Sequence, residues 1–165
     1  MVEVRLTAVR VDLQSNTPVV LLQEPGGTRR TLPIFIGPQE ATAIALALQG
    51  QATPRPMTHD LMKDLVFALG ASLERVVITE LVGTTYHAEL RLIRAGQAIT
   101  VDCRPSDAIA LAARTGTSLH VADEVIDSEG VVLAIEEEDD GANPDEILAE
   151  FQDFLNQVKP EDFSS

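Results

Sequence analysis

Cysteine is nearly missing from this chain of 165 residues, and Cys103 is its single example. One cysteine cannot form an intramolecular disulfide, and such sparing use fits a reducing compartment. No apolar run reaches the roughly 20 residues that a membrane-spanning helix needs. The first residues, Met1 to Arg5, alternate like a strand and lack the basic and then apolar layout of a signal peptide. These absences predict a cytoplasmic protein without a membrane partner.

Basic residues are scarce as well: 12 Lys and Arg stand against 26 Asp and Glu, for a net charge of −14. The excess acid is concentrated in residues 134–165, which hold 11 acidic residues and one basic residue. The basic surface typical of nucleic-acid-binding proteins is not evident, since only Arg29 with Arg30 and Arg91 with Arg94 approach it. HExxH, paired CxxC and phosphate-loop motifs are missing too, which argues against zinc sites and NTPase activity.

What the chain does contain is a strand that turns sharply into an alanine-rich helix. Residues 98–101 have strand character, Pro105 suits the first helical position, and Gly116 suits a left-handed helix end. The first turn of such a helix favours negative charge, which Asp107 supplies. The polar side chains at the mouth of this helix are Asp102, Arg104, Ser106 and Asp107. A charged Asp-x-Arg-x-x-Asp pattern is unusual at the foot of an apolar helix, so we look for chemistry here first.

A similar unit occurs earlier in the chain. Residues 32–36 form a predicted strand, followed by Pro38, Glu40 and an alanine-rich run that ends at Gly50. The Pro-x-acid spacing and the string Ala-Ile-Ala-Leu-Ala occur in both units, which suggests an internal duplication. Chance similarity is an equal alternative, because proline and an acidic residue are common at helix starts.

The apolar periodicity predicts an α+β fold with a mixed sheet. Two antiparallel β-meanders are expected, one before residue 37 and one over 75–103, each leading into an alanine-rich helix. A change of apolar phase near Ala8 and Val9 predicts a bulge in the first strand. A helix is expected over 59–69, with an apolar stripe of Leu61, Met62, Leu65, Val66 and Leu69. A short strand at 118–121 and a helical turn at 123–127 complete a domain that spans residues 1–133.

The rest of the chain has a different composition. Residues 134–143 are expected to form an acidic flexible linker, and residues 144–165 a C-terminal amphipathic helix and tail. The apolar stripe of this helix consists of Ile147, Leu148, Phe151, Phe154 and Leu155. We expect it to dock on an apolar groove of its own or a neighbouring subunit. Autoinhibition, with the acidic segment covering a positive groove, is the less favoured alternative.

Several separated segments resemble the bifunctional nuclease domain family. They are residues 36–41, 55–61 (RPMTHDL), 75–78 (RVVI), 102–112 (DCRPSDAIALA) and 121–125. The resemblance covers roughly residues 1–133 and does not extend to the acidic tail. It implies an α+β domain that is dimeric or higher and has DNase and RNase activity. The family has no short signature that identifies its catalytic residues.

Phosphodiester cleavage requires an activated water and stabilisation of the charge that develops on the phosphate. The predicted catalytic residues are Asp102, Arg104, Asp107, His59 and Asp60, and the predicted substrate-binding residues are Arg55, Lys63 and Ser106. The predicted ligands of a divalent ion, Mg²⁺ or Mn²⁺, are Asp102, Asp107 and Glu40. Structural alternatives stand beside several of these roles. Asp107 and Glu40 would complement helix dipoles, Arg104 would pair with an acid, and His59 would belong to a plain surface helix start.

The main functional hypothesis is therefore a homo-oligomeric nuclease that hydrolyses DNA, RNA or both at a cleft around residues 102–107. The residues leave open whether a divalent ion assists. The rival hypothesis is a non-catalytic regulatory or scaffolding module, suggested by the acidic balance and the lack of a decisive catalytic motif. Cys103 is a weak candidate nucleophile, because its place at the end of an apolar strand predicts a buried, inert thiol.

Overall fold

The computed structural model describes residues 1–27 and 29–132. The first elements are β1 (Val2–Asp12), β2 (Thr17–Gln23), β3 (Arg30–Phe35), α1 (Pro38–Leu48) and α2 (Thr58–Ala68). The next are β4 (Ala71–Val82), β5 (Thr85–Arg94), β6 (Gln97–Cys103) and α3 (Pro105–Thr115). The last are β7 (Ser118–Val121), α4 (Asp123–Glu129) and β8 (Val131–Val132). The predicted α+β class is confirmed, and the predicted acidic linker and C-terminal helix lie outside the described residues.

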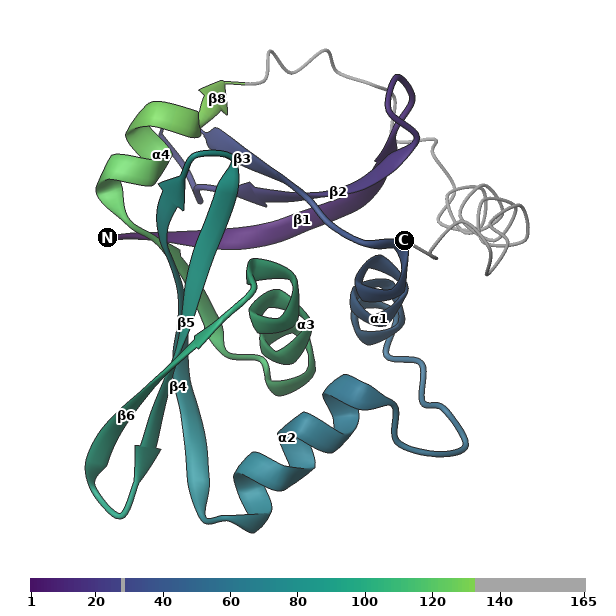
Figure 1. Ribbon diagram of the computed structural model, residues 1–165, viewed down its shortest axis with the longest axis vertical. Coiled ribbons are helices and arrows are strands. Elements are labelled where there is room, and N and C mark those ends of the chain that lie inside the picture. The colour runs from purple at the N-terminus through teal and green to yellow at the C-terminus, as the bar shows by residue number, and fades with distance from the viewer. Residues whose placement is uncertain (28, 133–165) are drawn as a thin grey trace. The chain divides into compact units, whose positions relative to one another are not determined.

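The strands form one eight-stranded mixed sheet in the order β6-β5-β4-β7-β1-β2-β3-β8. The two predicted meanders, β1-β2-β3 and β4-β5-β6, are both antiparallel. β7 lies between them, parallel to β4 and antiparallel to β1, and so joins the two halves (Figure 1). The pairing of β1 with β2 shifts register between Leu6 and Ala8, which places a bulge next to the predicted position.

Helices α1, α2 and α3 lie on one side of this sheet (Figure 1). Helix α4 lies away from these three helices and contacts β3 and β4. Alanine explains the close packing of α3, because Ala108, Ala110 and Ala112 are buried and their small side chains let neighbouring elements approach. α3 begins after Arg104, with Pro105 at its start, and ends at Gly116 with a φ of 71°, as the sequence predicts. α1 and α3 also contact each other, and the ion pair between Arg104 at the start of α3 and Glu40 in the first turn of α1 brings their N-terminal ends together.

Strand alternation assigns the side chains of β5 and β6 to two faces. Ala88 and Leu90 are buried on the face that α3 covers, and Leu90 lies opposite Val101 of β6. Glu89 points to the other face and lies opposite Asp102. Asp102 and its neighbour Cys103 therefore lie on opposite sides of the sheet.

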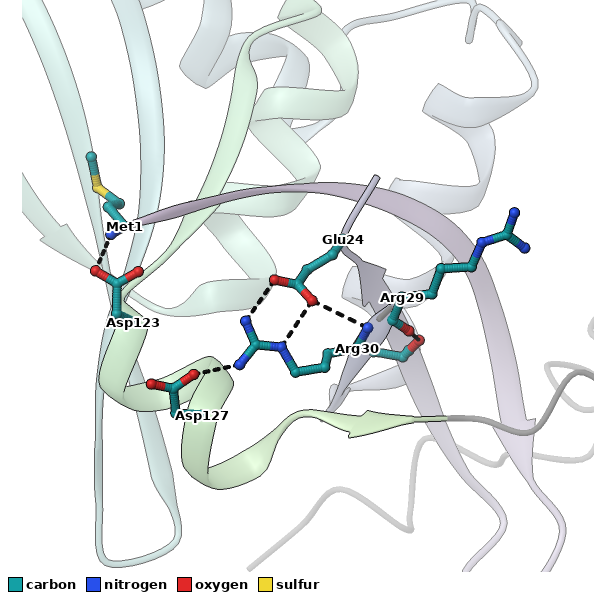
Figure 2. Close-up of polar contacts among 7 residues, drawn as sticks. Met1, Glu24, Arg29, Arg30, Asp123 and Asp127 are labelled. Carbon is teal, nitrogen blue, oxygen red and sulfur yellow. Dashed lines mark hydrogen bonds and ion pairs between the residues drawn. The ribbon is translucent and has the colours of Figure 1, made fainter. Parts of the chain in front are cut away.

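Ion pairs fasten α4 to the strands around it (Figure 2). The guanidinium of Arg30 on β3 binds Glu24 with an Nη2–Oε1 distance of 2.7 Å and also binds Asp127 of α4. The amino group of Met1 pairs with Asp123, at the start of α4. Arg30 is thus engaged in the fold, whereas Arg29 is exposed and its side chain points away from this cluster (Figure 2). No helix within residues 1–27 and 29–132 has the length and apolar character needed to cross a bilayer.

Candidate functional site

His59 of α2 and Asp107 of α3 meet although 48 positions separate them in the chain. The imidazole Nε2 lies 3.0 Å from Oδ1 of Asp107. A neutral imidazole must donate from Nε2 to this carboxylate, which leaves Nδ1 as the unprotonated nitrogen. The His59 side chain is 8% exposed, and His59 is the buried residue of α2. His59 therefore points inward and holds α2 against α3, unlike a residue at a plain surface helix start.

Arg104 extends this pair into a larger cluster. Its Nε donates to Oδ2 of Asp107 at 2.7 Å, and its Nη2 donates to Oδ1 of the same carboxylate at 3.0 Å. The same Nη2 lies 2.9 Å from Oε1 of Glu40, which belongs to the first turn of α1. The Arg104 side chain is 66% exposed, whereas that of Glu40 is 17% exposed. Two carboxylates thus hold one guanidinium at the surface, and part of it stays open to solvent.

The charges in this cluster stabilise one another. Burial acts to raise the pKa of Asp107, but hydrogen bonds from Arg104 and His59 outweigh it, so the pKa lies below its ordinary value. The hydrogen bond to Asp107 raises the pKa of Arg104. Asp107 is consequently ionised and Arg104 protonated throughout the neutral range.

An open groove of about 450 Å³ adjoins Arg104. Its walls come from Thr17, the end of β3, the turn before β5 and the start of α3; they are Thr17, Ile34, Phe35, Ile36, Gly37, Thr84, Thr85, Tyr86, Arg104, Pro105 and Ser106. The side chain of Glu40 lies next to this wall at Gly37. A Cβ atom added to Gly37 would be 2.3 Å from Oε2 of Glu40. Ser106, a predicted substrate-binding residue, lines the groove and is 7% exposed.

Asp60 belongs to a different network. Its Oδ2 accepts a hydrogen bond from the backbone N–H of Met57 at 2.9 Å, and its Oδ1 accepts one from Nε of Arg114 at 2.6 Å. These two bonds lower the pKa of Asp60, the Met57 bond having the larger effect. Asp60 therefore fixes the start of α2 and joins it to α3. Arg114 is a partner that the sequence analysis missed, because 54 positions separate the two residues.

The structure gives Lys63, Arg55 and Asp102 other contacts or surroundings. Lys63 pairs with Asp64 at 3.7 Å, and Arg55 is exposed in the segment before α2. Asp102 is exposed on the face of the sheet opposite α3. Of the five residues predicted to be catalytic, the structure thus brings together His59, Asp107 and Arg104, with Glu40 as a fourth member.

The predicted metal ligands do not assemble. Asp102 lies on the face of the sheet opposite α3. Glu40 and Asp107 are bridged by Arg104, whose positive charge opposes a cation at the same position. Within the part of the chain that the structure describes, no three His, Cys, Asp or Glu side chains form a group able to hold a metal ion. The described donors therefore do not fit a divalent ion in this arrangement.

Cys103 has the environment expected of an inert thiol. Its Sγ lies 3.6 Å from the carbonyl oxygen of Ala88. Burial, with smaller contributions from Asp107 and Asp102, raises the pKa of Cys103 to about 11. Very little thiolate exists at neutral pH, which argues against a nucleophilic role.

Comparison with known proteins decides the family. A model of the bifunctional nuclease domain matches residues 20–134 of this chain. The chain belongs to the bifunctional nuclease domain family. The matched segment contains every member of the His59–Asp107–Arg104–Glu40 cluster and nearly all of the groove.

The bacterial relative aligns with this bifunctional nuclease domain protein over nearly its full length, whereas the plant relatives align over only part of theirs. A Mycobacterium tuberculosis protein named as uncharacterized is 41% identical over 167 residues, spanning 100% of this chain and 99% of the relative. Bifunctional nuclease 1 of Arabidopsis thaliana is 29% identical over 117 residues, which are 69% of this chain and 36% of the plant protein. Bifunctional nuclease 2 of Oryza sativa subsp. japonica is 28% identical, with the same two coverages. The plant names thus belong to proteins of which the aligned domain forms about a third.

Proposed function

We propose that this protein cleaves phosphodiester bonds of DNA, RNA or both at the groove beside Arg104. Membership of the bifunctional nuclease domain family supports the reaction class. The observation that carries the location is the guanidinium of Arg104, held by two carboxylates yet open to solvent at the edge of a groove. A fixed guanidinium suits phosphate recognition, because its fork of N–H donors matches phosphate oxygens.

Some residues of the cluster contact the substrate, and others hold these residues in position. Arg104 contacts the phosphate and stabilises the charge that grows on its oxygens during cleavage. Asp107, oriented by His59, holds Arg104 in place and is a positioning residue. Glu40 uses Oε1 for Arg104, and its Oε2 lies beside Gly37 at the groove wall. We assign Glu40 the role of base that orients the attacking water and accepts its proton, while the P–O bond to the leaving sugar oxygen breaks and that oxygen takes a proton from solvent.

Metal assistance by Mg²⁺ or Mn²⁺ stays a prediction. The donors described above do not fit such an ion, so no step of the proposed reaction passes through one. Assays with and without divalent ions test this point directly.

The test is cleavage of labelled single-stranded DNA and RNA by protein purified from a nuclease-deficient host. Parallel reactions with EDTA, Mg²⁺ or Mn²⁺ test whether cleavage requires a divalent ion. We expect Arg104→Ala to lower kcat by about 10²- to 10³-fold, the loss typical when one group that stabilises the transition state is removed. Arg94→Ala, at an exposed arginine at the end of β5, should retain activity and serves as the matched control.

The rival role, a regulatory or scaffolding module, is favoured by one observation: Leu61 and Leu65 of α2 and Leu69 directly after the helix are all exposed. This role predicts that Arg104→Ala changes neither turnover nor binding of nucleic acid. Wild-type protein that cleaves nothing in any of the parallel reactions would rule out the nuclease proposal and leave the rival one.

A further inference from the structure

The groove beside Arg104 has an unusual concentration of aromatic side chains. Residues 1–27 and 29–132 contain three phenylalanine or tyrosine residues, Phe35, Phe67 and Tyr86, and two of them line this groove. Phe35 is 59% exposed. A large apolar ring left open to water in a groove is a surface on which a flat ligand can stack.

The remaining walls suit a sugar–phosphate chain. Three threonines and Ser106 supply hydroxyl groups, and Arg104 supplies a cation; the threonines are Thr17, Thr84 and Thr85. Hydroxyls, arginine and helix N-termini are common contacts of nucleic-acid phosphates. The residues that line the groove include no Asp or Glu, although Glu40 adjoins the wall at Gly37 and the whole chain carries a net charge of −14. Burial raises the pKa of Tyr86, and the nearby Glu129 adds to the shift, so its hydroxyl stays protonated and able to donate.

We propose that this groove binds a single-stranded segment of nucleic acid, with a base stacked on Phe35 and the adjoining phosphate at Arg104. The inference rests on the proposed nuclease function and adds the strandedness of its substrate. In a duplex, base faces are covered by their neighbours, whereas an unpaired base exposes its face to an aromatic ring. The volume of about 450 Å³ lies within the range of small-ligand pockets and suits one nucleotide unit at a time.

The test measures equilibrium binding by fluorescence anisotropy, using full-length protein and three labelled probes. The probes are a 12-mer of deoxythymidylate, an abasic 12-mer with the same sugar–phosphate backbone, and a duplex of equal length. Gel analysis after each titration confirms that the probes remain intact. The variants are Phe35→Ala and, as the matched control, Phe67→Ala, which removes a phenylalanine of similar exposure from α2.

We expect the base-containing single strand to bind more tightly than the abasic strand and the duplex. Phe35→Ala should weaken its binding by roughly 5- to 100-fold, the range for loss of one base–aromatic stack, and leave the abasic strand unaffected. Phe67→Ala should leave all three affinities within about twofold of wild type. Circular dichroism melts establish that both variants remain folded.

Three results would overturn the inference: no binding of the thymidylate strand by wild type, equal losses on the abasic strand, or equal losses in Phe67→Ala. Cleavage assays on the same preparations separate this inference from the proposed function. If the protein cleaves nucleic acid but Phe35→Ala does not change binding of the single strand, only the stacking site is refuted. Phe35-dependent binding without cleavage refutes the nuclease proposal and leaves a single-strand binding site.

Discussion

At the scale of single residues, the candidate site depends on glycine, which has no side chain, at position 37. Gly37 has a φ of −73°, which any residue adopts, so backbone conformation does not require glycine here. The requirement is space, because a Cβ at this position would lie 2.3 Å from Oε2 of Glu40. The carboxylate can move away from such a methyl group, but it would then leave Arg104.

Gly37→Ala should therefore separate activity from stability. Its ordinary φ means that alanine leaves the unfolding free energy unchanged or raises it by up to roughly 1 kcal/mol, through the entropy of the unfolded chain. Cleavage should fall at least tenfold because Glu40 loses its position. Thermal melts and initial cleavage rates measure the two effects. Gln39→Ala, at an exposed neighbouring position, is the control; full activity in Gly37→Ala would refute the role assigned to Glu40.

At the scale of elements, α2 differs most from its expected environment. The stripe predicted from its sequence is divided: Met62 and Val66 are half-buried, whereas Leu61, Leu65 and Leu69 are 53%, 52% and 62% exposed. The three leucines are four positions apart and therefore lie on one face of the helix. We propose that a second copy of the chain covers this face. Antiparallel pairing of two such helices about Leu65 would place Leu61 against Leu69 and make the contact self-complementary.

Leu65→Glu tests this assembly. We expect wild-type protein to be homo-oligomeric in size-exclusion chromatography with light scattering, and the variant to be monomeric at the same concentration. A charge at the centre of an apolar contact would be desolvated without a partner. Asp64→Ala, at the adjacent exposed position, should keep the wild-type mass. Wild type and Leu65→Glu eluting with the same mass would contradict the proposed interface.

At the scale of the whole molecule, contacts between polar and charged side chains hold two of the helices together. His59–Asp107 and Asp60–Arg114 both join α2 to α3, and the Arg114 side chain is 7% exposed. Both carboxylates have lowered pKa values in the folded protein. A lowered pKa contributes stability above the unfolded value of 3.8, and this contribution is lost as pH falls through the folded value.

The unfolding free energy should consequently decrease as pH falls below 3.8. Asp60→Asn should cost roughly 1–3 kcal/mol at pH 7, because it leaves the buried guanidinium of Arg114 without its charged acceptor. The difference between this variant and wild type should shrink in the acid range, where wild-type Asp60 becomes protonated. Urea denaturation at several pH values measures this, with Asp64→Asn as control. A difference that stays constant down to pH 2 would contradict the assignment.

Much of the fold was predictable because its causes are local. Proline at a helix start, glycine at a helix end and the period of two in strands depend on neighbouring residues, so α3, β6 and the bulge in β1 follow from the sequence. The same alternation indicates that Asp102 and Cys103 point to opposite faces of β6. The two-residue strand β8 was missed, since so short a segment shows no period.

The chain alone placed Arg104 and Asp107 at the mouth of α3, three positions apart on one helical turn, and it placed Glu40 in a second Pro-x-acid turn. Only the tertiary structure decided that these turns meet, that His59 points inward, and that Asp60 turns to Arg114. It also decided that Phe35 and Tyr86 share a groove. The physical reason is that these contacts depend on α1 packing against α3 and on β7 pairing between β4 and β1. Such pairings join residues dozens of positions apart, and no local pattern in the sequence encodes them.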